Sequence, residues 1–192
     1  MSLIRAFIAI ELPVELRPEL AALETLLKKN SPPVIKWVDP ASIHVTLKFL
    51  GDTSDAIIDK LLLAMAESVV GITPFVLETR QLGEFPSIDR PKVIWVGVNG
   101  ELDKLARLRD NIEKNTEVLG FKREFRPFSP HLTLGRVRDG ARLNEIQRIG
   151  KLINETTFTA LHNIDVKHIN LLKSQLTAAG AIHTVIGTVK LK

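Results

Sequence analysis

The sequence predicts an α+β fold made of two related halves, in which mainly antiparallel sheets are flanked by helices. Helical and strand-like patterns alternate along its 192 residues, as this class requires. The tetrapeptide His44–Leu47 (HVTL) returns as His131–Leu134 (HLTL). Ile8 and Trp95, each within a strand-like run, precede the two copies by the same 36 residues (44 − 8 and 131 − 95). We therefore predict a bilobal duplication with a pseudo-twofold axis and a central cleft between the lobes.

Four segments place apolar residues at helical spacing. In the first of them, Leu16, Leu20, Leu23 and Leu27 form one apolar stripe, which is typical of a helix that buries one face. A glycine follows the second and the third segment, where it can end a helix. The expected helices span residues 14–29, 54–70, 101–119 and 142–153.

Nine apolar, β-branched runs are bounded by turn residues, as strands are. They span residues 3–10, 34–38, 43–50, 75–82, 93–98, 131–137, 158–166, 168–172 and 181–191. No linker or low-complexity segment divides the chain. We therefore expect a single two-lobed domain over residues 1–192, with approximate sequence halves 1–90 and 91–192.

Composition excludes several classes of function. The chain is 45% hydrophobic and has no cysteine, which excludes disulfides, thiolate catalysis and cysteine-ligated zinc. Its N-terminal apolar run is too short for a signal peptide, and no stretch reaches the ~18 apolar residues of a membrane span. We expect a cytoplasmic protein with no membrane partner. The net charge of +4 mildly favours an anionic partner, but the dispersed charges also suit a solvated surface.

The repeated motif predicts a two-histidine catalytic site. In a strand, residues i and i+2 share a face, so His44 lies beside Thr46, and His131 beside Thr133. Strict alternation also turns Lys48 to the face of His44, where it could contact a phosphate. One histidine can deprotonate an attacking oxygen while the other protonates a leaving oxygen, and threonine hydroxyls can meet the charge on the remaining oxygens. Metal-free cleavage of a phosphodiester needs these groups.

The other aromatic and histidine residues are interpreted one by one. Phe85 and Phe128 lie in proline-flanked loops and are candidates for stacking a nucleobase. Trp95 lies in an apolar run and is assigned to the core. The remaining histidines, His162, His168 and His183, match no zinc-ligand spacing, so we expect surface or packing roles for them and no metal site.

Segments across nearly the whole chain resemble the two-histidine (2H) phosphoesterase superfamily, and within it the RNA 2′,3′-cyclic phosphodiesterases, also called 2′-5′ RNA ligases. The matching segments are RAFIAI at 5–10, KWV at 36–38, HVTLKFLG at 44–51, FPS at 85–87, RPKVIWVGV at 90–98, PHLTLGR at 130–136 and LLKSQL at 171–176. The resemblance implies a two-lobed α+β catalytic domain. It also implies cofactor-independent hydrolysis of a terminal 2′,3′-cyclic phosphate to a 2′-phosphomonoester.

Carried over to this sequence, the resemblance makes His44 and His131 the catalytic pair. It implies that Thr46 and Thr133 bind the phosphate, that His131 activates water, and that His44 protonates the leaving oxygen. The residues themselves do not distinguish the acid from the base. Arg136 becomes a further phosphate contact, which requires a bulge or twist near Gly135, because strict alternation would turn it to the opposite face.

The chain departs from the family pattern at one position. His183 stands where many relatives have tyrosine near the C-terminus, and the chain has no tyrosine at all. This departure removes the basis for inferring base stacking at that position, whereas the residues expected to perform the chemistry are intact.

Two alternative functions remain open at this point. The same groups could run the reaction backwards and join RNA ends through a 2′-5′ linkage, or the cleft could bind RNA without turnover. Intact motifs in both halves argue against pure binding, because binding needs no pair of titrating groups. The expected partners are RNA ends or nucleotides with a 2′,3′-cyclic phosphate, tRNA fragments among them, and the chain is expected to be a monomer.

Overall fold

The computed structural model describes residues 2–159, 162–177 and 180–192. Its strands are β1 (Leu3–Glu11), β2 (Ile35–Trp37), β3 (His44–Ser54), β4 (Phe75–Phe85), β5 (Val93–Gly100), β6 (His131–Val137), β7 (Asn163–Val166), β8 (His168–Thr177) and β9 (Gly180–Lys190). Its α-helices are α1 (Arg17–Asn30), α2 (Ile58–Ser68), α3 (Leu102–Glu117) and α4 (Leu143–Glu155). Short 3₁₀ turns precede α1, β3 and α2 at Val14–Leu16, Pro40–Ser42 and Asp55–Ile57.

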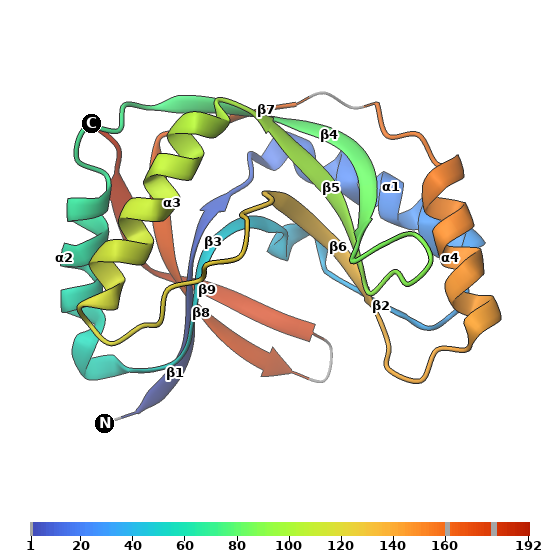
Figure 1. Ribbon diagram of the computed structural model, residues 1–192, viewed down its shortest axis with the longest axis horizontal. Helices are drawn as coiled ribbons and strands as arrows, with labels where there is room; N and C mark the ends of the chain where they lie inside the picture. Colours follow the sequence, from blue (N-terminus) through green and yellow to red (C-terminus); the bar gives the residue numbers. More distant parts are fainter. Residues whose placement is uncertain (1, 160–161, 178–179) are drawn as a thin grey trace.

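The strands form one curled antiparallel sheet in the order β7-β4-β5-β6-β3-β1-β8-β9, with β2 added beside β6 (Figure 1). The two halves of this sheet meet between β3 and β6, which share a single paired position, Val45 with Leu132. The α+β class with antiparallel strands and flanking helices is therefore confirmed. The two expected sheets are joined edge to edge at this point.

Each half of the sheet draws on both halves of the sequence. β1 and β3 lie with β8 and β9, while β4 lies with β5, β6 and β7. The helices divide in the same way: Figure 1 shows α2 and α3 together at one end of the molecule and α1 and α4 at the other. The chain thus crosses between the lobes, so neither lobe is built from one continuous segment of the sequence. That residues 1–192 act as one catalytic domain, with approximate sequence halves 1–90 and 91–192, stays a prediction.

The main core lies between the sheet and the helices. Leu16, Leu20 and Leu27 of the predicted stripe are fully buried in it, beside Val45 and Leu132. A separate small cluster of Phe7, Ala9 and Leu172 packs on the other face of the sheet. Apolar residues on both faces of β1 explain its continuous apolar run, and the second cluster supports the region where the motifs lie.

Every expected helix and strand is present, and the differences concern their ends. The strand that begins at His44 continues through Gly51 to Ser54, because Gly51 adopts a positive φ of 71° that lets the chain stay paired with β1. The strand expected at 158–166 begins at Asn163, and residues 160–161 lie outside the described residues. Within the described part of the chain, no helix combines the length and apolar character needed to cross a membrane.

Candidate active site

The two HxT motifs lie side by side where the halves of the sheet meet. Val45 and Leu132, the central residues of the motifs, pair with each other and are both 0% exposed in the main core. Since side chains alternate along a strand, the residues before and after this pair turn to the opposite face. The sheet therefore presents both motifs on one surface, at the joint between the lobes.

The pairing register brings the four polar side chains together. Because the strands are antiparallel, His44 lies across from Thr133, and Thr46 lies across from His131. In a regular pair, opposite Cβ atoms are about 4.5–5.5 Å apart and diagonal positions about 7–8 Å. In this register the histidines occupy one diagonal and the threonines the other, on one face of the sheet.

The two histidines are held in the same way. The Nδ1–H of His44 donates to the carbonyl oxygen of Ser42 at 2.8 Å, and that of His131 donates to the carbonyl of Ser129, also at 2.8 Å. A carbonyl can only accept, so each neutral ring carries its proton on Nδ1 and leaves Nε2 with a free lone pair. Nε2 is thus the atom that can accept or, after protonation, donate a proton at the site.

Burial sets the protonation state of both rings. It lowers the pKa of His44 from 6.5 to about 4, and the nearby His183 and His131 add repulsion against a positive charge. Burial also lowers the pKa of His131, with a smaller contribution in the same direction from Arg136. Both rings are therefore neutral at pH 7 in the free protein. A bound anion raises the pKa of a nearby histidine and so supplies the protonated form that an acid catalyst needs.

Aromatic rings surround each histidine, but they differ between the lobes. The ring of His44 stacks on Phe7, with centroids 4.6 Å apart, and meets the edge of His183 at 5.2 Å. The ring of His131 meets Phe85 edge to face at 5.0 Å.

Trp95, which the sequence assigned to the core, lies beside these two rings instead, 4.9 Å from Phe85 and 6.4 Å from His131. Its neighbours Ile94 and Val96 occupy the core face, and alternation turns the indole to the other side. The core assignment of Trp95 is therefore wrong.

A bulge follows the threonine in each motif. In β3 the register against β1 skips Leu47, and in β6 the register against β5 skips Leu134. Each skip reverses the alternation beyond it. In β6 this returns Arg136 to the face of His131, where its charge contributes to the pKa of that histidine. The bulge that the assignment of Arg136 required is present; the contact of Arg136 with phosphate stays a prediction.

The bulge in β3 moves Lys48 away from the histidines. Strict alternation put Lys48 on the face of His44, but after the bulge it lies 5% exposed under α3. Its ammonium donates to Glu113 Oε2 at 2.5 Å and to the carbonyl of Lys122 at 2.9 Å. The expected face of Lys48 is therefore wrong. Phe49, which is 69% exposed and contacts Phe7, takes that place, and strict alternation could not have predicted it.

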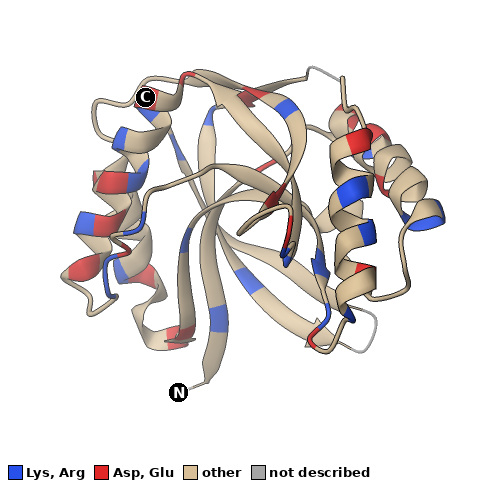
Figure 2. Cartoon of the chain, turned by 45° about the vertical axis from the view of Figure 1, so that its right-hand side comes forward, with Lys and Arg blue, Asp and Glu red and all other residues tan. Residues whose placement is uncertain are grey.

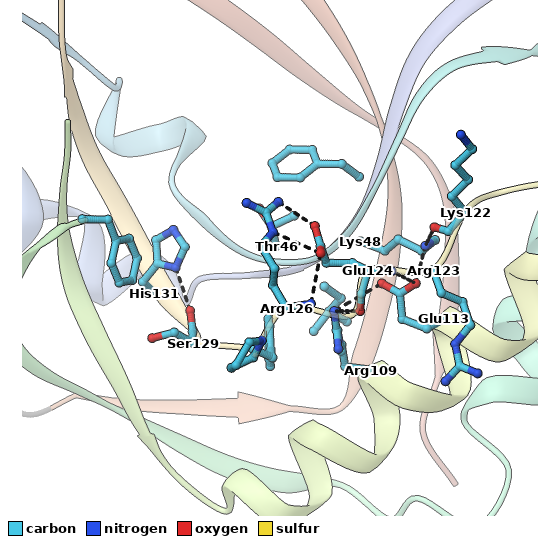
Figure 3. Close-up of a pocket in the computed structure, with 15 residues that line it drawn as sticks. Thr46, Lys48, Arg109, Glu113, Lys122, Arg123, Glu124, Arg126, Ser129 and His131 are labelled. Carbon is cyan, nitrogen blue, oxygen red and sulfur yellow. Dashed lines mark hydrogen bonds and ion pairs between the residues drawn. The ribbon is translucent and has the colours of Figure 1, made fainter.

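A cavity of about 600 Å³ opens beside His131 (Figure 3). Thr46, Phe85 and Phe128 line it, so the structure brings both stacking candidates to the site. In Figure 3, His131 lies at one end, the Lys48–Glu113–Lys122 cluster lies at the other, and Arg126 lies between them. Base stacking by Phe85 and Phe128 stays a prediction. Phe128 already packs under the guanidinium of Arg109, 5.4 Å from the ring centre.

The other histidines have separate surroundings. His162 pairs with Glu19 of α1, and His168 begins β8 at an exposed position. His183 contacts both Phe7 and His44, so it belongs to the wall of the site, although its position relative to His44 could not be read from the motif. Among the described residues, no group of three or more His, Asp or Glu is placed to hold a metal ion.

The fold and the paired motifs define a class of protein. A family model described as "2'-5' RNA ligase superfamily" matches residues 12–177, so the chain belongs to the 2′-5′ RNA ligase superfamily. Similar proteins are named "RNA 2',3'-cyclic phosphodiesterase". One from Aeropyrum pernix is 34% identical over 171 residues, covering 89% of this chain and 94% of its own length. Another, from Methanothermobacter thermautotrophicus, is 31% identical over 181 residues, covering 94% and 95%.

Solved structures show the same fold. Escherichia coli LigT in complex with 3′-AMP superposes with a TM-score of 0.79 at 23% identity, covering 100% of this chain and 99% of that one. A protein from Thermus thermophilus superposes with a TM-score of 0.75 at 25% identity and 97% coverage of both chains. These solved structures therefore share the fold of this chain over nearly its whole length.

Proposed function

We propose that this protein hydrolyses the 2′,3′-cyclic phosphate at the end of an RNA to a 2′-phosphomonoester, and that His44 and His131 are its acid–base pair. The observation that carries the proposal is the register at the joint of the sheet: the residues that flank the Val45–Leu132 pair are two histidines and two threonines, and they share one face of the sheet. The names of similar proteins support the same reaction.

The reaction needs two proton transfers on opposite sides of phosphorus. The Nε2 of one histidine takes a proton from water as the water oxygen bonds to phosphorus. The Nε2–H of the other gives its proton to the 3′ oxygen as the bond from phosphorus to that oxygen breaks. Since Nδ1 of each ring is bound to a carbonyl, Nε2 of each is the atom presented to substrate. By resemblance, His131 is the base and His44 the acid.

The charge of the transition state is met by the remaining groups. Thr46 and Thr133 supply hydroxyl donors from the same face as the histidines, and Arg136 supplies a positive charge from beyond the second bulge. These side chains provide proton transfer and charge stabilisation without a metal ion, so we expect activity in EDTA.

Two further parts of the proposal concern where and how the chain works. Both histidines come from one chain and meet within one sheet, so a monomer contains the whole site. The cytoplasm is the proposed compartment, where RNA ends are processed and a chain without cysteine needs no oxidising environment. A single species of monomeric mass in sedimentation analysis is the expected result for the oligomeric state.

The decisive experiment is product analysis on a 2′,3′-cyclic nucleotide and on an RNA with the same end, in EDTA. We expect a 2′-phosphate product, and loss of about 10²- to 10⁴-fold in kcat/KM for His44→Ala or His131→Ala. His168→Ala, an exposed histidine at the start of β8, is the matched control. A 3′-phosphate product, or full activity in the double variant His44→Ala/His131→Ala, would overturn the proposal.

A further inference from the structure

The loop between α3 and β6 leads from the site to the surface and carries cationic and aromatic residues close together, with Glu124 among them. Within residues 122–128 it carries Lys122, Arg123, Phe125, Arg126 and Phe128. Five cationic and two acidic residues line the cavity that this loop borders. The charge along the helices is mixed instead, since Figure 2 shows basic and acidic residues side by side on them. The cavity is thus a place where positive charge is concentrated.

Buried contacts hold this loop in place from beneath. The carboxylate of Glu113, 2% exposed, accepts from Lys48 Nζ at 2.5 Å and from the backbone N–H of Glu124 at 3.1 Å. Arg109 Nη2 donates to the carbonyl of Glu124 at 2.8 Å, and Lys48 Nζ donates to the carbonyl of Lys122 at 2.9 Å. The loop backbone is therefore fixed before any ligand binds, which reduces the entropy lost on binding.

The outer side of the loop is open. Phe125 is 85% exposed, and the guanidinium of Arg123 lies 5.8 Å from its ring centre. The side chain of Arg126 is 84% exposed and pairs with Glu124 of the same loop, to which its Nε and Nη2 donate at 3.0 and 2.6 Å. An exposed aromatic ring between two cations provides a face for base stacking and charges for the adjoining phosphates, which is how single-stranded nucleic acid is bound without sequence preference.

We propose that this loop binds the RNA strand on the 5′ side of the terminal cyclic phosphate, with Phe125 stacking on a base and Arg123 and Arg126 meeting phosphates. This inference rests on the proposed function. A nucleotide whose 2′ and 3′ oxygens both join the cyclic phosphate continues into the chain only through its 5′ oxygen. His131, Ser129 and Phe128 line the same cavity as Arg123 and Arg126, so the cavity connects the site with the cations of the loop.

The test compares a 2′,3′-cyclic mononucleotide with an RNA hexamer that ends in the same nucleotide. We expect the hexamer to have the higher kcat/KM, and the ratio of the two values to fall about tenfold in Phe125→Ala. Phe125→Leu keeps an apolar side chain without a π face and should lower the ratio similarly. Arg126→Ala should reduce the slope of log KM for the hexamer against log salt by about 0.7.

Matched controls come from α4, at the other end of the molecule. Leu143→Ala removes a side chain that is 68% exposed, Arg148→Ala removes an exposed cation, and both should keep the ratio of the parent protein. Equal kcat/KM for the two substrates, or a ratio unchanged by Phe125→Ala, would overturn the inference. If neither substrate is hydrolysed, the proposed function fails. In that case the Kd of a labelled hexamer tests RNA binding by the loop without turnover. A Kd unchanged by Phe125→Ala would contradict the proposed role of the loop.

Discussion

The strands β3 and β6 carry the same motif and the same bulge, yet they bring different chemistry to the site. After the bulge, β3 presents Phe49 beside Phe7, whereas β6 presents Arg136 beside His131. His44 is packed between Phe7 and His183, which is why its pKa falls to about 4. Beyond the bulge, one lobe therefore supplies a further aromatic ring and the other a cation.

The residues at the two bulges differ for reasons of packing. Gly135 lies under β2, where a Cβ atom would be 2.8 Å from Cγ2 of Ile35, so no larger residue fits without movement. Lys48, at the corresponding place in β3, has α3 beneath it and extends to Glu113. Duplicated motifs thus keep the reacting groups equivalent, while the elements packed behind them make the two halves unequal.

The largest expected effect separates the roles of the two histidines. A substrate whose leaving 3′ oxygen is replaced by sulfur needs no protonation of the leaving group, because a thiolate leaves readily. Removal of the acid should therefore cost little with this substrate, whereas removal of the base should still cost about 10²- to 10⁴-fold in kcat/KM. We expect His44→Ala to be rescued and His131→Ala not. Rescue of His131→Ala alone would reverse the assignment.

A pair of cation substitutions should separate stability from activity. Lys48→Met leaves the buried carboxylate of Glu113 without its closest cation, since both side chains are 3% exposed, and should lower the free energy of unfolding by about 3–5 kcal/mol. Arg136→Met, at an exposed position, should change stability by no more than about 0.5 kcal/mol but lower kcat/KM about 10- to 100-fold. Urea unfolding and steady-state kinetics measure the two effects.

Two outcomes of these measurements would contradict the assigned roles of Arg136 and Lys48. If Arg136→Met keeps full activity, the second bulge does not serve phosphate binding. If Lys48→Met keeps its stability, the pair with Glu113 does not hold the loop in place.

The last effect concerns the dependence of stability on pH. The pKa of His44 is lowered from 6.5 to about 4 on folding, so between these values the unfolded chain binds more protons than the folded one. Stability should therefore fall as the pH drops from about 6.5 to 4, by up to about 1.4 kcal/mol per pH unit from this group. His44→Gln should flatten this part of the curve in urea titrations, and a curve of unchanged slope would contradict the pKa assignment.

Much of the fold could be predicted because local patterns and burial agree in this chain. Leu20, Leu23 and Leu27 of the predicted stripe lie in α1 and Leu16 directly precedes it, and alternation within each motif correctly turned Val45 and Leu132 into the core. Predictions that extended the same alternation past the threonines were less successful. Lys48 was placed on the wrong face, and Trp95 was assigned to the core, although its own strand turns it toward His131.

The sequence by itself determined which groups could react and that each histidine has a threonine beside it, because both follow from the residue types and the two-residue period of a strand. The tertiary structure decided how the motifs meet, since the single pair between Val45 and Leu132 joins segments far apart in the chain. It also decided that Phe49 and Arg136 face the site. A bulge is a property of two paired strands, so its position depends on β1 and β5 as much as on the motif itself.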